Sequence, residues 1–234
     1  MPGPIVDVDV CVVGGGQSGL ATAYHLVRAN RRRTVPLAFV VLDERDGPGG
    51  AWVDGWDSLR LFSPADVDAM GPVLADPDVI RLTGSAHTTA EVAEMAARTA
   101  LDDRTRAWYA TRAEQPDRLD LALVDRATDA CVGEAVINEW SPEDRSANLR
   151  ILIGPAGRDR GLGSEAVRIL VDHAFAATDL ERVSLEVMAF NPRARRVYER
   201  AGFVEEGRLR GAFRFDGEPV DVIVMAMLRS DPRG

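Results

Sequence analysis

The chain has 234 residues, of which 46% are hydrophobic and 28% charged, and its formal net charge is −9 at pH 7. These values are ordinary for a globular protein, and the acidic balance argues against a nucleic-acid binder, whose phosphate contacts need clustered Lys and Arg. The chain has neither an apolar run of the roughly 20 residues that a membrane span needs nor a signal-peptide pattern at its start. We therefore expect a cytoplasmic protein without nucleic-acid or membrane partners.

Cysteine and histidine are sparse. Cys11 and Cys131 each lie in an apolar, strand-like run, so we expect buried thiols in a reducing compartment rather than a disulfide. The three histidines are scattered and show no metal-ligand spacing, so we expect no metal site.

The first quarter of the chain predicts a strand–helix–strand unit. Apolar runs at 8–13 and 38–42 flank a helical pattern over 20–29, and the first turn is Gly14-Gly-Gly16-Gln-Ser-Gly19. Asp43 follows the last of these glycines by 24 residues. Glycines that admit a pyrophosphate and an acid that binds ribose are typical of dinucleotide binding.

The residues that follow, Gly47-Pro-Gly-Gly50-Ala-Trp52 and 56–64, resemble the opening of FAD-binding flavin monooxygenases. No later G-x-G-x-x-G follows a strand, and a lone unit of this kind buries too little surface to fold alone. We interpret residues 1–57 as a truncated, Rossmann-like βαβ segment in which FAD binding is not expected. The alternative interpretation is an FAD- or NAD(P)-binding oxidoreductase fragment.

A second domain is predicted over residues 58–234. The first strand is 58–62, and Ser63-Pro-Ala-Asp66 supplies the N-cap, the first-turn proline and the acid for a helix over 65–74. A capping box at Thr88–Glu91 starts a helix over 89–114 that is broken near residues 102 and 103. Strands follow at 118–124 and 131–140.

The central motif of this domain is a strand, a glycine turn and a helix. Residues 149–153 predict a buried strand, Gly161 and Gly163 precede a helix over 165–177, and Arg158 and Arg160 lie beside the turn. Glycines at a helix start let a ligand approach the free N–H groups of the first turn, which bind phosphate.

A second block follows with a strand over 183–187, Asn191, a helix that carries Tyr198, and Gly202-Phe203. Strands over 203–209 and 220–228 are joined by an Asp216-Gly217 hairpin turn. The two blocks together resemble the GNAT superfamily of N-acetyltransferases, and the closing residues resemble its ribosomal-protein N-terminal branch. The resemblance implies an α/β (α+β) GNAT fold, in which helices flank a mixed, mostly antiparallel central sheet, here with the Rossmann-like appendage in front.

The resemblance also implies acetyl-CoA as the cosubstrate and a set of residues that bind it. The strand would offer its backbone to the pantetheine arm, the glycine turn would bind the pyrophosphate, and Asn191 would contact the cofactor. These predicted cofactor-binding residues are Ile151, Leu152, Ile153, Arg158, Asp159, Arg160, Gly161, Leu162, Gly163, Ser164 and Asn191.

Tyr198 is the predicted general acid for the departing CoA thiolate. It lies seven residues after Asn191, two turns along the same helix face, at the place where the family has this tyrosine. The alternative role is that of a core tyrosine.

Glu186 is the predicted general base, because it is a lone carboxylate in an apolar strand and a buried acid acquires a raised pKa. It lies 12 residues before Tyr198, as the base does in N-terminal acetyltransferases. Glu186 paired with an arginine, or Glu139 as the base, are the alternatives.

The acceptor is predicted only as a class, an amine of a small molecule or of a protein N-terminus. Trp140, Glu139, Glu143 and Asp144 form either a rim that attracts a cationic amine or an ordinary solvated loop. A homodimer is compatible with the resemblance. A third alternative is a regulator that binds acyl-CoA without turnover.

Overall fold

The computed structural model describes residues 9–13, 26, 30, 33–35, 37–42, 58–112, 115 and 117–232. The internal contacts of the chain divide it into two units, Met1–Asp57 and Ser58–Gly234.

The N-terminal unit contains two described strands, β1 (Val10–Val13) and β2 (Phe39–Leu42), which pair in parallel with Val10 opposite Phe39. Both strands lie where the apolar runs predict them. The glycine turn at 14–19, most of the predicted helix and Asp43 lie outside the described residues. The expectation of a buried thiol is wrong for Cys11, which is exposed, and Cys131 of the second unit is half-buried.

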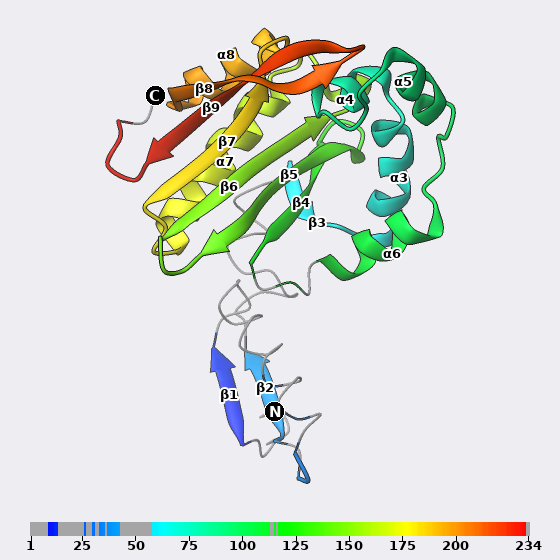
Figure 1. Ribbon diagram of the computed structural model, residues 1–234. Coiled ribbons are helices and arrows are strands. Elements are labelled where there is room, and N and C mark those ends of the chain that lie inside the picture. Colours follow the sequence, from blue (N-terminus) through cyan, green and yellow to red (C-terminus); the bar gives the residue numbers. More distant parts are fainter. Residues whose placement is uncertain are drawn as a thin grey trace. The chain divides into compact units, whose positions relative to one another are not determined.

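The C-terminal unit is built on a seven-stranded sheet with the order β3-β4-β5-β6-β7-β9-β8 (Figure 1). Its strands are β3 (Leu59–Leu61), β4 (Leu119–Asp125), β5 (Ala130–Ser141), β6 (Ser146–Ile153), β7 (Arg182–Met188), β8 (Val204–Phe215) and β9 (Glu218–Leu228). Only the β6–β7 pair of this sheet is parallel. The predicted mixed, mostly antiparallel sheet is confirmed.

The helices of this unit are α3 (Pro64–Leu74), α4 (Pro77–Leu82), α5 (Thr89–Ala96), α6 (Asp103–Thr111), α7 (Leu162–Ala177) and α8 (Pro192–Ala201). Asp76 ends α3, as predicted, but its side chain also accepts from the Val79 amide and begins α4, which the sequence interpretation missed. The helical stretch predicted over 89–114 with a break near residues 102 and 103 is two helices, α5 and α6, and Asp102 caps α6 by accepting from the Thr105 amide.

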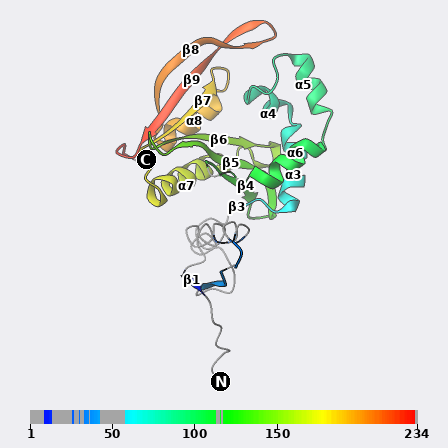
Figure 2. The ribbon, with the colours of Figure 1, turned by 60° about the horizontal axis from the view of Figure 1, so that its bottom comes forward.

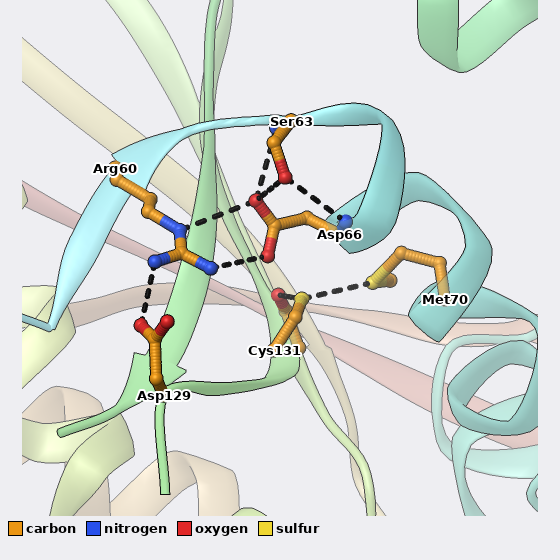
Figure 3. Close-up of polar contacts among 7 residues, drawn as sticks. Arg60, Ser63, Asp66, Met70, Asp129 and Cys131 are labelled. Atoms are coloured by element: carbon orange, nitrogen blue, oxygen red, sulfur yellow. Dashed lines mark hydrogen bonds and ion pairs between the residues drawn. The ribbon is translucent and has the colours of Figure 1, made fainter.

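The start of α3 shows how local chemistry fixes this part of the fold. Ser63 and Asp66 cap the helix reciprocally, and buried Asp66 accepts two hydrogen bonds from Arg60 of β3, at 2.8 and 3.2 Å (Figure 3). Arg60 also donates to Asp129 at 2.7 Å. The buried carboxylate is thereby paired, and Arg60 connects β3 to α3 through Asp66 and to the β4–β5 turn through Asp129.

The sheet carries helices on both faces. Leu152 belongs to a buried cluster with Val67 and Met70 of α3 and Tyr109 of α6. A Cβ added at Gly163 of α7 would lie 2.9 Å from the next strand residue, Ile153. Because neighbouring residues in a strand point to opposite faces, α3 and α6 cover one face and α7 the other (Figure 2).

Candidate active site

The strands β6 and β7 separate part-way along their length. They pair only from Ser146 opposite Arg182 to Asn148 opposite Ser184, although β6 continues to Ile153 and β7 to Met188. On their other sides both strands remain paired, β6 with β5 and β7 with β9. The backbone of residues 149–153 therefore faces an opening, as the predicted pantetheine contact requires.

A bulge in β5 lies at the level where the opening begins. The β5–β6 register shifts between Asn138 and Ser141, and Glu139 there has a φ of 54°. Asn138 pairs with Asn148, the last residue of β6 that also pairs with β7. A bulge bends its strand and increases the local twist, which gives a physical reason for the divergence of β6 from β7.

The N-terminus of α7 lies at the end of the glycine turn that follows β6. Gly161 is the N-cap residue, with a φ of 81°, and no side chain caps the first turn. A Cβ at Gly161 would meet no atom of the described residues within 4 Å, so the described part of the chain leaves the space in front of the helix open. Uncapped first-turn N–H groups facing open space form an anion-binding site.

One cavity of about 960 Å³ joins the glycine turn to the opening between the strands. Most of the predicted site residues line it: Ile151, Leu152, Ile153, Arg158, Asp159, Gly161, Gly163, Ser164, Glu186, Asn191 and Tyr198. Arg160 and Leu162 are not among the lining residues in the described part of the chain.

The two arginines of the glycine turn, Arg158 and Arg160, form ion pairs with aspartates of the protein. Arg158 donates to the Ile153 carbonyl at 3.0 Å and pairs with Asp76 and Asp78, which ties the turn to α4. Arg160 donates to both carboxylate oxygens of Asp125, at 2.8 and 2.9 Å. The structure therefore does not place the predicted cofactor residue Arg160 in the cavity, because an aspartate at the end of β4 binds its guanidinium.

We expect Arg160→Gln to leave the Kd for acetyl-CoA within about threefold, because the side chain points to Asp125 rather than to the ligand. Arg160 and further hydrogen bonds lower the pKa of Asp125 to about 2, so this carboxylate stabilises the fold above its unfolded pKa of about 3.9 and loses that effect as the pH falls toward 2. The variant should therefore show a smaller loss of stability between pH 4 and 2. Isothermal titration and acid unfolding followed by circular dichroism measure the two effects. A tenfold weaker Kd for acetyl-CoA would show that Arg160 contributes to the cofactor site.

Tyr198 lies on the face of α8 that lines the cavity. The residue is 6% exposed, and its ring packs edge-on against Phe203, with 6.0 Å between the centroids. Burial raises the pKa of Tyr198 to about 12. The side chain is thus both a packed core residue and a cavity residue, so the two roles that the sequence offered are not exclusive. Asn191 caps the same helix by accepting from the Ala194 amide at 3.1 Å.

Glu186 lines the cavity but is exposed, between buried Leu185 and Val187, so the predicted burial of its carboxylate is wrong. The reason is that burial in β7 is confined to the other face of the strand, which carries Val183, Leu185 and Val187. Within the described residues Glu186 has no hydrogen-bond or ion-pair partner, so the pairing with an arginine is not seen either. Glu139 also lines the cavity and accepts one long hydrogen bond from Asn138, at 3.5 Å.

Several lining residues had no role in the sequence interpretation. Val79 and Leu82 of α4 and Val222 and Val224 of β9 form an apolar wall, next to Thr83 at the end of α4. Arg150, Arg182, Arg196 and Arg200 add charge. Of these residues, Arg150 is the one that the sequence could have singled out, because its charge interrupts the apolar run 149–153. Of the proposed rim, only Glu139 lines the cavity, and Ser141 and Asp144 hydrogen-bond each other in the adjoining turn.

Other kinds of site find no support in the described part of the chain. Its His, Cys, Asp and Glu side chains form no group of three or more that would hold a metal ion. None of its helices combines the length and the apolar character that a membrane crossing needs.

Comparisons with known proteins agree with this geometry. A family model of the acetyltransferase (GNAT) domain matches residues 58–204, and a model of the NAD(P)-binding Rossmann-like domain matches residues 12–55. The chain therefore belongs to the GNAT acetyltransferase family. The predicted class, an acetyl-CoA-dependent N-acetyltransferase, is confirmed at the level of the family.

The relatives are N-acetyltransferases by name. Spermidine N(1)-acetyltransferase of Vibrio cholerae is 32% identical over 108 residues, 46% of this chain and 62% of that protein. The putative ribosomal N-acetyltransferase YdaF of Bacillus subtilis is 30% identical over 91 residues, 39% of this chain and 50% of that protein. The chain thus spans only about half to three fifths of the length of these relatives.

Among solved structures, a Vibrio cholerae spermidine N-acetyltransferase in complex with CoA and spermine matches with a TM-score of 0.63. The match covers 74% of this chain and 95% of that one at 23% identity. It supports the fold of the C-terminal unit.

Proposed function

We propose that residues 58–234 transfer the acetyl group of acetyl-CoA to a primary amine by direct attack of the amine on the thioester. The observation that carries this proposal is the opening between β6 and β7, which runs from the uncapped N-terminus of α7 to Tyr198 and Glu186 in one cavity. A thioester needs an approach for the nucleophile, stabilisation of the oxyanion and help for the departing sulfur, and this cavity supplies groups for each.

The cofactor would lie along the strand and across the helix N-terminus. The N–H groups near Gly161, Gly163 and Ser164 would bind the pyrophosphate, and the unpaired backbone of 151–153 would bind the pantetheine arm and the thioester oxygen. Arg196 and Arg200 line the cavity from α8 and have no ion-pair partner among the described residues, so they are available to further phosphate oxygens.

Tyr198 would donate a hydrogen bond to the sulfur as negative charge develops on it. A thiol in water has a pKa of about 8.5, so a phenol with a pKa of about 12 is the weaker acid and complete proton transfer is uphill. Burial of the thiol in the cavity would narrow this difference between the two pKa values, because burial raises the pKa of a thiol as it does that of a phenol. Tyr198 is therefore better suited to donate a hydrogen bond to the sulfur than to transfer its proton fully before the carbon–sulfur bond breaks.

The amine must lose a proton, and Glu186 is the proposed acceptor of it, directly or through water. Its carboxylate lines the cavity and has no partner among the residues that the structure describes, so it can contact an ammonium group. Glu139, on the bulge of β5, is the competing candidate.

We expect Glu186→Gln to lower kcat/KM for an amine acceptor by about 100-fold, while the Kd for acetyl-CoA stays within about twofold. Glu139→Gln is the matched control, since it removes a cavity carboxylate of the same size, and it should lower kcat/KM by less than tenfold. Steady-state assays of released CoA across pH 6 to 9 give both values. An unchanged pH profile of kcat/KM for Glu186→Gln, together with a large loss for Glu139→Gln, would transfer the role to Glu139.

A separate proposal concerns the N-terminal segment. We propose that residues 1–57 form a partial dinucleotide-binding unit in front of the catalytic domain, with the boundary at residues 57 and 58, and that the unit does not bind FAD. The parallel β1–β2 pair and the short match over residues 12–55 support the Rossmann-like part of this proposal. The flavin monooxygenase likeness, a homodimer and a cytoplasmic location stay predictions.

A further inference from the structure

The charged side chains of the cavity differ in whether the protein neutralises them. Arg182 pairs with Glu206 at 2.7 and 2.5 Å, and buried Glu134 pairs with Arg112 at 2.7 Å. Arg150 and Glu186 line the same cavity, and neither has a hydrogen-bond or ion-pair partner among the described residues. Arg150 and Glu186 are therefore available to a ligand at the end of the cavity where β6 and β7 diverge, and Glu139 lines the same cavity.

Strand geometry places Arg150 and Glu186 on the two sides of the opening. Asn148 and Ser184 are the last paired residues of the parallel strands β6 and β7. Arg150 and Glu186 each follow by two residues, so both side chains share the sheet face of that pair. They would be neighbours if the pairing continued, and the divergence of the strands leaves a gap between them instead of an ion pair.

Arg150 contributes little to the packing of the fold. It is exposed, although Leu149 and Leu152 beside it in the strand and Val136 opposite it in β5 are buried. A guanidinium presents five N–H donors in a planar fork, a geometry that matches a carboxylate. Arg150 interrupts the apolar run 149–153 on the wall of the cavity and has no partner among the described residues, so it is suited to bind an anionic group.

We propose that Arg150 determines acceptor specificity by binding a carboxylate of the acceptor, while Glu186 faces the acceptor's amine. The acceptor class is then amino-acid-like, with a carboxylate near the reacting amine, and not a polyamine. The inference rests on the proposed acetyl transfer and narrows its substrate. A polyamine could place one ammonium group beside Glu186, but Arg150 would repel its further positive charges.

The test compares each amino acid with its own amide, because the two differ at the carboxylate alone. Free amino acids, their amides, spermidine and O-phosphoethanolamine are assayed with the full chain, Arg150→Gln and Arg150→Lys. We expect Arg150→Gln to lower kcat/KM for the amino acid about 10- to 100-fold, the effect of losing a charged hydrogen-bonding partner, and for the amide less than threefold. Arg150→Lys should restore part of the preference, and Arg182→Gln, the arginine held by Glu206, should leave the acid-to-amide ratio unchanged.

A binding measurement separates this inference from the proposed activity. Amino acids and amides are titrated calorimetrically into the CoA-saturated protein and into Arg150→Gln. Carboxylate-dependent binding that Arg150→Gln removes supports the inference even if no amine is acetylated, and that result would contradict only the proposed activity. Equal loss for acid and amide, a preference for spermidine, or a preference for the phosphate ester over the carboxylate would each overturn the inference.

Discussion

Replacing Gly161 by glutamate is expected to weaken acetyl-CoA binding by about 1,000-fold. The new carboxylate would stand in the open space before α7, where its charge would be attracted to the first-turn N–H groups and would repel the pyrophosphate. Losing two charge-assisted hydrogen bonds costs about 3–6 kcal/mol, and 4 kcal/mol is close to a 1,000-fold change in Kd. Isothermal titration of acetyl-CoA into the full chain measures the effect.

Gly217 offers a matched control for backbone strain. It has a φ of 83°, close to that of Gly161, and a Cβ there would also meet no described atom within 4 Å. Gly217 lies in the β8–β9 turn and does not line the cavity. Gly217→Glu should therefore destabilise the fold to a similar degree, by about 1–2 kcal/mol, and bind acetyl-CoA normally. Binding by Gly161→Glu as tight as by Gly217→Glu would show that the glycine turn does not contact the cofactor.

Replacing Tyr198 by phenylalanine is expected to lower kcat by about 100- to 1,000-fold without changing the Kd for acetyl-CoA by more than about threefold. The ring and its contact with Phe203 remain, and only the hydroxyl that would bind the departing sulfur is lost. Because the pKa of Tyr198 is about 12, the phenol stays protonated through the assay range. The pH profile of kcat below pH 10 should thus keep its shape in the variant.

Tyr109→Phe is the control for removal of a buried hydroxyl elsewhere. Tyr109 donates to Glu134 at 3.0 Å, so its loss should lower the free energy of unfolding by about 1–2 kcal/mol and leave kcat within a few-fold. Single-turnover kinetics with preformed acetyl-CoA complex, and urea unfolding, measure the two effects. A Tyr198→Phe enzyme with wild-type kcat would leave Tyr198 as a packing residue only.

Local chemistry in the sequence was sufficient for most elements of the C-terminal unit. Ser63 and Thr88 begin helices, Asp216-Gly217 turns a hairpin with both residues at positive φ, and the apolar runs form the strands. The two helix starts that the sequence interpretation missed have one cause. Asp76 and Asp102 were interpreted only as points where a helix ends or breaks, whereas each also accepts a hydrogen bond from the first turn of a new helix.

The sequence by itself determined the family, the glycine turn and the positions of Tyr198 and Asn191, because these depend on residue types at fixed short spacings along one strand and one helix. Tertiary structure alone decided which charges are free. Asp125 binds Arg160 from 35 residues away, Glu206 binds Arg182, and an uncovered sheet face exposes Glu186. Arg150 stays unpaired among the described residues because β6 and β7 diverge just before it. Such pairings depend on distances between strands that are remote in sequence, and no spacing along the chain encodes them.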